Sequence, residues 1–306
     1  MKAVGGGGGR GMRPVHAVDD LDAAFGLAVA EAQASFGDPR LYLERYVARG
    51  RHIEVQLLGD GTRVVAVGDR DCSIQRRYQK LIEEAPAPGL DESLRARMHD
   101  AAVRFASRLQ YRGAGTVEFL VDCERNEFYF LEMNARIQVE HPVTEAVTGL
   151  DLVAEQIAIA EGRPLQGHAR EFEHGGHAIE CRINAEDWLD DFRPSPGTVS
   201  AAAFPTGPGI RVDTHVQAGA RVPPHYDSLL AKLVVHARSR AEACGRMAHA
   251  LRACRIEGVA TNVDLHREVV ASDAFRRGGA DTHWLRSFLA DRRTGAGLGR
   301  STGAGQ

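Results

Sequence analysis

The chain has 306 residues, of which 38 are basic and 41 acidic, and its net charge is −3 at neutral pH. This near balance gives no electrostatic basis for binding nucleic acid or an anionic membrane surface. No apolar run reaches the roughly 18 residues that a membrane-spanning helix needs. With 43% hydrophobic residues, the chain is long enough for one large domain or two to three smaller ones with buried cores.

Two residue types are used unusually. The five cysteines (Cys72, Cys123, Cys181, Cys244 and Cys254) form an odd set without Cys-x-x-Cys spacing. We therefore expect reduced thiols and a cytoplasmic location, not a disulfide framework or a zinc site. Of the basic residues, 35 are Arg and three are Lys, namely Lys2, Lys80 and Lys232. Because an ammonium is a compact charge and a guanidinium a planar fork, a retained lysine indicates a tight site.

The first conformational signal is a run of glycines from Gly5 to Gly9, followed by Arg10 and Gly11. Such a run is either a flexible linker or a loop whose amides approach a ligand closely. No Gly-Lys-Ser/Thr sequence follows it, which excludes a Walker A loop. Apolar residues at helical spacing then predict a helix over 20–35 that ends at Gly37.

Strand and helix patterns follow along the chain. We expect strands at 41–46, 52–58 and 63–67, with a hairpin turn at Asp60-Gly61. We also expect a helix over 94–109 with the apolar stripe Leu94, Met98, Ala101, Phe105 and Leu109, strands at 116–121 and 128–133, and a helix over 144–160. Short strands follow, with one helix opened by the capping box Ser239-x-x-Glu242 and a disordered tail over 292–306. The lack of regular strand–helix alternation predicts the α+β class.

The hairpin over 116–134 carries the most specific chemical signal. If it is symmetric about Arg125, Glu118 and Glu132 face each other, and Asn134 shares the face of Glu132. Two facing carboxylates repel each other, which destabilises the hairpin unless a cation lies between them. Carboxylate and amide oxygens suit Mg²⁺, so we predict a metal site here. The alternative is a solvent-facing hairpin edge with ordinary surface acids.

The residues after the hairpin continue its polar face. In an extended chain, Asn134, Arg136, Gln138 and Glu140 all point the same way. A guanidinium, an amide and a carboxylate base that converge there predict a site for a small planar oxyanion. A second polar cluster over 70–80 ends at Lys80 and is followed by Glu83-Glu84; taken alone, it is equally compatible with a solvated charged strand.

These segments together resemble the biotin carboxylase family, the ATP-grasp component of acyl-CoA carboxylases. The resemblance covers about residues 2–290 and rests on an ordered set of motifs. They are the Gly loop, the cluster over 69–88, Tyr111-Arg-Gly-Ala-Gly-Thr-Val-Glu-Phe119, Glu132-Met-Asn-Ala-Arg-Ile-Gln-Val-Glu-His-Pro-Val-Thr-Glu145, Glu180-Cys-Arg-Ile-Asn-Ala-Glu-Asp187 and Pro194-Ser-Pro-Gly197. The implied fold is an α+β ATP-grasp fold with a lid subdomain over 1–48, a core over 49–165, the family's C-terminal domain over 166–290 and a tail over 291–306.

The resemblance also implies a reaction in two steps. ATP and bicarbonate give carboxyphosphate, and its CO₂ is then transferred to N1 of biotin. By motif position, the implied nucleotide residues are Lys2, Gly7, Gly8, Gly9, Glu44, Val47, His52, Gln75, Tyr78, Lys80, Glu118 and Glu132. The implied ligands of Mg²⁺ or Mn²⁺ are Glu118, Glu132 and Asn134. Bicarbonate would be held by Lys80, Arg136, Gln138, Val139 and Glu140. The implied catalytic residues are Lys80, Arg136, Glu140 as the base, and Arg182, which would stabilise the biotin enolate.

The sequence departs from the family pattern in two places. Many members have His where this chain has Tyr78, and the family's N-terminal domain, which precedes the Gly loop, is absent here. We therefore expect a truncated product whose complete form would be a homodimer. No lysine has the Ala-Met-Lys-Met context of a biotin acceptor, so separate partners are implied: a biotin carboxyl carrier protein and carboxyltransferase subunits.

Two other interpretations remain open at this point. One is a different ATP-grasp ligase that activates another carboxylate, against which the 136–140 segment and Arg182 argue. The other is an inactive remnant or a subunit-interaction fragment. The absent N-terminal domain favours that interpretation, and the intact set of candidate site residues opposes it.

Overall fold

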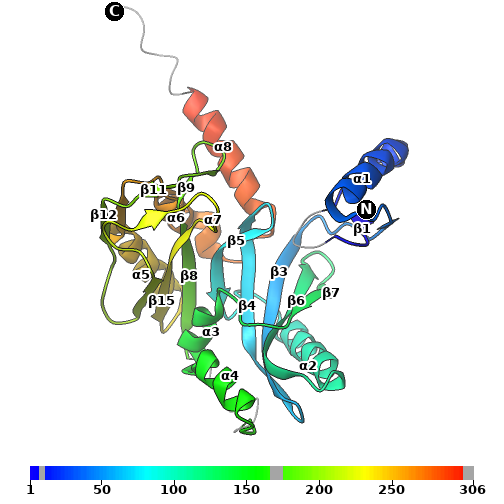
Figure 1. Cartoon of the computed structure of the whole chain (residues 1–306), viewed down its shortest axis with the longest axis horizontal. Helices are drawn as coiled ribbons and strands as arrows, with labels where there is room; N and C mark the ends of the chain where they lie inside the picture. Colours follow the sequence, from blue (N-terminus) through cyan, green and yellow to red (C-terminus); the bar gives the residue numbers. More distant parts are fainter. Residues whose placement is uncertain (7–10, 166–174, 299–306) are drawn as a thin grey trace, which may run out of the picture. The chain divides into compact units, whose positions relative to one another are not determined.

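The computed structural model describes residues 1–6, 11–165 and 175–298 (Figure 1). The chain divides into two compact units, one formed by residues 1–48 and 76–79 and the other by residues 49–75 and 80–306. Each unit is described by itself. Within the described ranges, no helix combines the length and the apolar character needed to cross a membrane.

The described residues of the first unit form an α-helix and a small sheet. β1 (Lys2–Ala3) pairs antiparallel with β2 (Leu41–Tyr42), and a 3-10 turn, η1 (Val18–Asp20), precedes α1 (Leu21–Phe36). α1 ends at Gly37, whose φ of 69° is the left-handed conformation that glycine adopts without strain. The predicted helix and its stop signal are confirmed, whereas the strand predicted over 41–46 ends at Tyr42.

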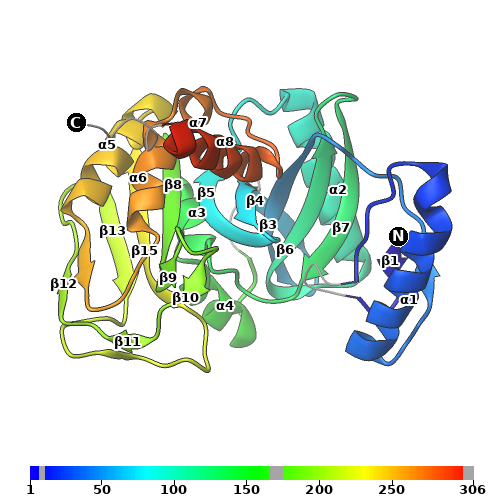
Figure 2. The ribbon, with the colours of Figure 1, turned by 90° about the horizontal axis from the view of Figure 1, so that it is seen from above.

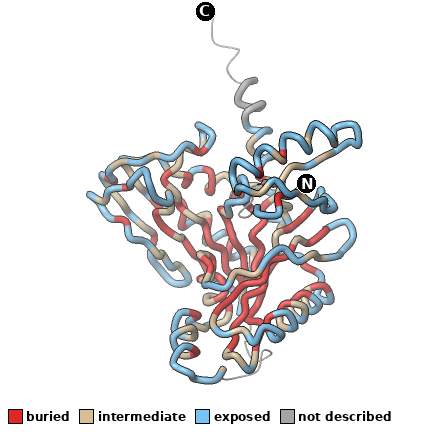
Figure 3. Tube along the Cα trace, turned by 45° about the vertical axis from the view of Figure 1, so that its right-hand side comes forward, coloured by how far each residue is buried: buried red, intermediate tan, exposed pale blue. Residues whose placement is uncertain are grey.

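The second unit is built on an eight-stranded sheet with the order β13-β15-β8-β5-β4-β3-β6-β7 (Figures 1 and 2). The strands are β3 (Gly50–Asp60), β4 (Val64–Arg76), β5 (Gln79–Ala85), β6 (Arg112–Asp122), β7 (Glu127–Asn134), β8 (His177–Asn184), β13 (Ile210–Thr214) and β15 (Leu229–Ala237). The pairs β13–β15, β15–β8, β8–β5, β4–β3, β3–β6 and β6–β7 are antiparallel. Helices and strands thus combine as the α+β class predicts, and Figure 3 shows buried residues along these strands.

α2 (Glu92–Arg108) covers one face of β3 and β6. Asp91 caps it by accepting a hydrogen bond from the amide of Leu94 (2.9 Å). Its buried stripe is Leu94, Met98, Ala102 and Ala106, so the predicted stripe is correct at its start and wrong at its end. The buried face continues through Ala102 and Ala106, whereas Phe105 is 39% exposed and Leu109, which lies just beyond the end of the helix, is 59% exposed.

The helix predicted over 144–160 is two helices. α3 (His141–Thr148) ends at Gly149, which has a φ of 73°, and α4 (Leu152–Ala160) begins after Asp151, whose carboxylate accepts from the amide of Ala154 (2.8 Å). A left-handed glycine ends the first helix and an acidic N-cap residue begins the second, and the apolar periodicity did not reveal this break. α3 packs on β5, β8 and β15, and α4 packs on β3, β4 and β6.

The C-terminal half of this unit packs three helices against β8 and β15. These are α5 (Arg240–Ala253), α6 (Val263–Ala271) and α7 (Asp273–Arg277). The Ser239 hydroxyl accepts from the amide of Glu242 (3.3 Å), as the capping box predicts. The short strand pairs around them are β9 (Glu186–Asp187) with β10 (Arg193–Pro194), β11 (Gly197–Thr198) with β14 (Arg221–Val222), and β12 (Ala201–Ala203) with β16 (Arg255–Glu257).

The C-terminal tail differs from its prediction. α8 (Trp284–Leu298) continues through the first seven residues of the segment predicted to be disordered over 292–306. Glycine-, serine- and threonine-rich composition therefore did not predict the structure of 292–298, where the chain continues a helix whose first turns pack Trp284 and Phe288 against the core. Residues 299–306 lie outside the described part of the chain.

The observed stripe of α2 makes a testable distinction between Met98 and Leu109. Met98 is 0% exposed, so Met98→Ala should lower the free energy of unfolding by about 2–5 kcal/mol through lost burial and a cavity. Leu109→Ala is the matched control and should change it by less than about 1 kcal/mol. Urea denaturation followed by circular dichroism measures both; a larger loss for Leu109→Ala would restore the stripe predicted from sequence.

Candidate active site

The centre of the site is the ammonium of Lys80, at the start of β5. Its Nζ lies 2.6 Å from Glu54 Oε2, 2.9 Å from Glu118 Oε1 and 2.6 Å from Glu140 Oε1. Burial by itself would lower the pKa of Lys80, but the surrounding acidic groups outweigh it and raise that pKa well above its ordinary value. Three carboxylates from β3, β6 and the turn before α3 therefore converge on one cation.

Glu54 is a site residue that sequence reasoning missed. Its second oxygen accepts a hydrogen bond from Arg70 Nε (2.5 Å), and both side chains are 0% exposed. Arg70 is held in turn by Gln56 (2.7 Å) and Thr144 (2.8 Å). Burial raises the pKa of Glu54, but Arg70 and Lys80 outweigh this effect and lower it to about 2. The available signal was polar residues at every second position, 52, 54 and 56, within an otherwise apolar strand.

Glu140 links Lys80 to the second cation of the site, Arg182 on β8. Arg182 donates from one terminal nitrogen to Glu140 Oε2 (2.7 Å) and from Nε to Glu83 Oε1 (2.5 Å). The Arg182 carbonyl accepts from Asn262 Nδ2 (2.9 Å) and His266 Nε2 (2.8 Å), which fixes its backbone against α6. Burial disfavours the charged guanidinium, and Glu83 and Glu140 more than offset that by raising the pKa of Arg182.

The register of the predicted hairpin is confirmed at the site end. Glu118 pairs with Glu132, and Thr116 with Asn134. A bulge between Glu118 and Phe119 shifts the pairing by one residue. Between the bulge and the turn, the strands therefore do not follow the register predicted from symmetry about Arg125. Without that extra residue in β7, Glu118 would face Leu131; the bulge is what aligns the two carboxylates.

The two facing acids do not have the same surroundings. Glu118 Oε2 lies 3.0 Å from His52 Nε2, and its Oε1 accepts from Lys80 and from Gln138 Nε2 (3.2 Å). The Asn134 amide donates to both Glu118 and Glu132, at 3.2 Å each. Burial raises the pKa of Glu118, and His52 and Lys80 outweigh it and lower the pKa to about 2. The protein's own cation therefore offsets the repulsion that was expected to require a metal.

The donor set still fits a hard divalent cation. Glu118, Glu132 and Asn134 offer carboxylate and amide oxygens from adjacent strands, which is the ligand chemistry that Mg²⁺ and Mn²⁺ accept. His52, Glu54 and Glu118 also bring one donor atom each to within 4.8 Å of one another. Since Lys80 touches two of these three, a bound cation would share its acidic ligands with the lysine.

The backbone conformation predicted for the oxyanion site is wrong. Residues 135–140 form a bend and a turn and are not extended. The side chains nevertheless lie together, because Arg136 donates to Gln138 Oε1 (3.0 Å) and to Asn134 Oδ1 (3.3 Å). The Val139 carbonyl accepts from Lys232 Nζ (3.1 Å). The turn places the Glu140 side chain in the interior, where it is 0% exposed.

The residues implied for the nucleotide are divided between the two units. In the first unit, Lys2 Nζ lies 3.2 Å from both Glu44 oxygens, Val47 is half-buried and Tyr78 is 61% exposed. In the second unit, His52 contacts Glu118 and Gln75 is buried. Gly7, Gly8 and Gly9 lie outside the described residues.

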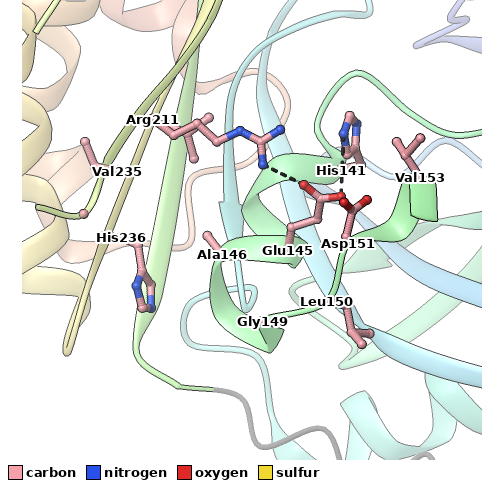
Figure 4. A pocket seen from close by; sticks show the side chains of 12 residues that line it. His141, Glu145, Ala146, Gly149, Leu150, Asp151, Val153, Arg211, Val235 and His236 are labelled. Atoms are coloured by element: carbon pink, nitrogen blue, oxygen red, sulfur yellow. Dashed lines mark hydrogen bonds and ion pairs between the residues drawn. The ribbon is translucent and has the colours of Figure 1, made fainter. Parts of the chain in front are cut away.

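A separate hollow of about 600 Å³ shares no lining residue with the Lys80 cluster (Figure 4). Arg211 of β13 points across it and donates to Glu145 (2.6 Å) and to Asp213 (2.8 and 2.9 Å). The guanidinium of Arg211 is thus already paired with carboxylates of the protein.

Comparison with known proteins decides the family. Residues 1–168 match the model of the carbamoyl-phosphate synthase L chain ATP-binding domain, and residues 180–287 match the biotin carboxylase C-terminal domain. The chain belongs to the biotin carboxylase family. The expected α+β ATP-grasp fold is confirmed with it.

Several members of the family are similar over most of this chain. Biotin carboxylase of Nostoc is 50% identical over 289 residues, and that of Pseudomonas aeruginosa is 49% identical over 290; each match covers 94% of this chain and 64% of the relative. A Campylobacter jejuni biotin carboxylase structure has a TM-score of 0.88 at 46% identity, with the same coverage of both chains. The biotin carboxylase domain of Hydrogenobacter thermophilus 2-oxoglutarate carboxylase has a TM-score of 0.89 at 44% identity, again covering 94% and 64%. This chain thus spans 64% of the length of these two curated relatives.

The environment of Glu118 predicts an acid-dependent effect on stability. Its folded pKa of about 2 is below the ordinary value of 4.5, so the unfolded state binds more protons between those pH values. The stabilisation is therefore complete above about pH 5 and is lost as pH falls towards 2. Glu118→Gln should lower the free energy of unfolding at pH 7 by about 3 kcal/mol, and the difference from the wild type should shrink at pH 3.

Glu132→Gln is the matched control for this comparison, because Glu132 faces Glu118 but is exposed. Urea titrations from pH 3 to pH 7 provide the measurement. A pH-independent difference for Glu118→Gln, or an equal loss for Glu132→Gln, would contradict the assigned interactions.

Proposed function

We propose that this chain is a ligase that carboxylates biotin with ATP and bicarbonate. The observation that carries the proposal is the position of Glu140, whose two oxygens contact Lys80 Nζ (2.6 Å) and Arg182 (2.7 Å). The two cations can attract an anion such as bicarbonate, and Glu140 then lies where its carboxylate can accept the proton of that anion. Membership of the biotin carboxylase family supports the assignment, and so does the similar Hydrogenobacter thermophilus domain, which was solved with bound ADP and bicarbonate.

In the proposed first step, bicarbonate lies against Arg136, Gln138 and Val139. Glu140 accepts its proton, and the bicarbonate oxygen attacks the terminal phosphorus of ATP, which releases ADP and forms carboxyphosphate. Lys80 stabilises the negative charge that develops on the transferred phosphoryl group. The nucleotide would be held by Lys2, the glycines Gly7 to Gly9, Glu44, Val47, His52, Gln75 and Tyr78.

The acids of the hairpin have a different proposed role. Glu118, Glu132 and Asn134 would hold Mg²⁺ or Mn²⁺, which when bound neutralises the phosphate oxygens of the nucleotide. In the second step, carboxyphosphate would break into CO₂ and phosphate, the phosphate would take the proton from N1 of biotin, and N1 would then attack the carbon of CO₂. Arg182 would stabilise the enolate oxygen of biotin, since its guanidinium already lies beside Glu140.

The proposal extends to partners. Biotin would be presented by a separate carrier protein, and carboxyltransferase subunits would use the product. The matched relatives include a subunit of the Methanothermobacter thermautotrophicus pyruvate carboxylase and a 2-oxoglutarate carboxylase domain, so the proposal names biotin and not the final acceptor. A homodimer is supported by the dimer named for the Hydrogenobacter domain. The five unpaired cysteines support a reducing compartment, and we propose the cytoplasm.

Glu140 and Arg182 should separate the two half-reactions. Loss of the base prevents bicarbonate attack, so Glu140→Gln should lower both bicarbonate-dependent ADP release and carboxybiotin formation by ~10²–10⁴-fold. Arg182 acts on the enolate, so Arg182→Gln should lower carboxybiotin formation by ~10²–10³-fold and leave ADP release without biotin nearly intact.

The controls for these variants are Glu161→Gln and Arg163→Gln, a pair at the exposed end of α4. Both should keep wild-type rates. Equal loss of both activities in Arg182→Gln would remove Arg182 from the enolate role. A wild-type chain that forms neither ADP nor carboxybiotin would overturn the proposed function for this chain.

Lys80→Arg tests whether the shape of the cation matters. One nitrogen contacts three carboxylates at 2.6–2.9 Å, and a planar guanidinium cannot reproduce that arrangement. We expect kcat for ADP release to fall on the order of tenfold or more although the charge is kept. Steady-state kinetics measures the effect; a near-normal kcat would show that charge alone suffices.

A further inference from the structure

Two acidic side chains of the second unit face each other across neighbouring strands beside the site. Glu83 of β5 and Glu180 of β8 are register partners, and both are 0% exposed. Side chains at directly opposite positions have Cβ atoms about 4.5–5.5 Å apart, so the two carboxyl groups can meet. This places two acids side by side in a region from which water is excluded.

The hydrogen bonds of this pair are incomplete. Glu83 Oε1 accepts from Arg182 Nε (2.5 Å), but Glu83 Oε2 and both oxygens of Glu180 have no hydrogen-bond partner among the described residues. A buried carboxylate without a partner is strongly unfavourable. One proton resolves the difficulty, because the O–H of one carboxyl can donate to the free oxygen of the other.

The charged side chains near this pair already contact other groups. Arg182 is shared between Glu83 and Glu140, and the Lys232 ammonium from β15 lies 3.1 Å from the Val139 carbonyl and 3.2 Å from Asp213. Among the titratable residues of α3, which packs on this face of the sheet, His141 lies against the Gln138 carbonyl and Glu145 pairs with Arg211. The rest of the α3 contact is apolar, with Val143 and Val147 packed on Ala85 and Ala178, each two residues from one of the acids.

The electrostatics agree with this geometry. Burial raises the pKa of Glu83 to about 7, although Arg182 opposes the effect. Burial, together with the negative charge of Glu83, raises the pKa of Glu180 well above its ordinary value. Because two interacting acids titrate as a unit, the proton belongs to the pair.

We propose that Glu83 and Glu180 share one proton at neutral pH, and that Glu180 is thereby a positioning residue for Arg182, acting through Glu83. With the proton in place, the pair presents a single negative charge, and Glu83 holds Arg182 by Nε while another guanidinium nitrogen reaches Glu140. Without it, two adjacent charges would compete for the same guanidinium. The positioning role rests on the proposed function, whereas the shared proton does not.

Infrared spectroscopy of the full chain tests the proton directly. A protonated carboxyl gives a C=O stretch distinct from that of a carboxylate. The wild type should show this band at neutral pH, and Glu180→Gln should lack it, because the amide then donates to an ionised Glu83. Glu161→Gln, at an exposed position, should retain it. An unchanged band in Glu180→Gln, or none in the wild type, would overturn the shared proton.

The stability of the same variants gives a second measurement. The folded pair keeps a proton that the unfolded chain releases above the ordinary carboxyl pKa, so folding is favoured at low pH and this advantage is lost as pH rises. Between about pH 5 and 7, the unfolding constant of the wild type should rise relative to that of Glu180→Gln by about tenfold per pH unit. A constant ratio would contradict the proposal. Failure of Glu180→Gln to fold would also count against it, since glutamine mimics the protonated acid.

The positioning role needs an activity measurement with rescue. Glu180→Ala leaves Glu83 without its proton donor, so carboxybiotin formation should fall on the order of tenfold while ADP release without biotin changes little. Glu180→Gln should restore carboxybiotin formation. Equal rates for Glu180→Ala and the wild type would overturn the role of Glu180. Absence of activity in the wild type would overturn the proposed function, and the infrared band would still decide the shared proton.

Discussion

The contact of Lys80 with three carboxylates is the interaction on which the rest of the site depends. Glu54, Glu118 and Glu140 come from different segments, and like charges at this spacing would otherwise drive the segments apart. The ammonium attracts all three carboxylates and so offsets the repulsion among them. It thereby lets β3, β6 and the turn before α3 lie close together on one face of the sheet, while α2 covers the opposite face.

The same sheet shows how the surroundings decide the state of a buried acid. Glu54 lies between Arg70 and Lys80, and its pKa falls to about 2, whereas neither oxygen of Glu180 has a hydrogen-bond partner among the described residues and its pKa rises. Both side chains are 0% exposed, so burial is the same for both. Acids with cationic partners act as fixed charges, whereas the proposed proton-sharing pair of Glu83 and Glu180 acts as a unit with a single negative charge.

Much of the site could be predicted from sequence because its signals are local. Symmetry about Arg125 predicted the pairing of Glu118 with Glu132, which the structure reaches only through the bulge, and Gly37 and Ser239 marked helix ends. The Leu131 bulge could not be foreseen, since one extra residue in a strand leaves no mark in alternation over a short hairpin.

Other parts depend on partners that are distant in sequence. Glu54 gains its role only through Arg70 and Lys80, and a buried Arg70 with four side-chain acceptors has no local signature. The bend over 135–140 was missed because alternating polar residues are equally compatible with a strand and with a turn that packs one of them inward. The break at Gly149 was missed because apolar periodicity continues on both sides of it.

The contacts of the site join residues that are far apart in the sequence, which affects when they form during folding. Lys80 joins residues 26, 38 and 60 positions away, and Arg182 joins Glu83 across 99 positions. Closing loops of this length is entropically unfavourable before the contacts form, so such contacts are made late in folding. If only the earlier strands have folded, the acidic side chains of β3 and β6 lie close together before Arg182 has joined them. We therefore expect the charged centre to appear in the final, cooperative stage of folding, together with the joining of β5 to β8 that brings Arg182 to it.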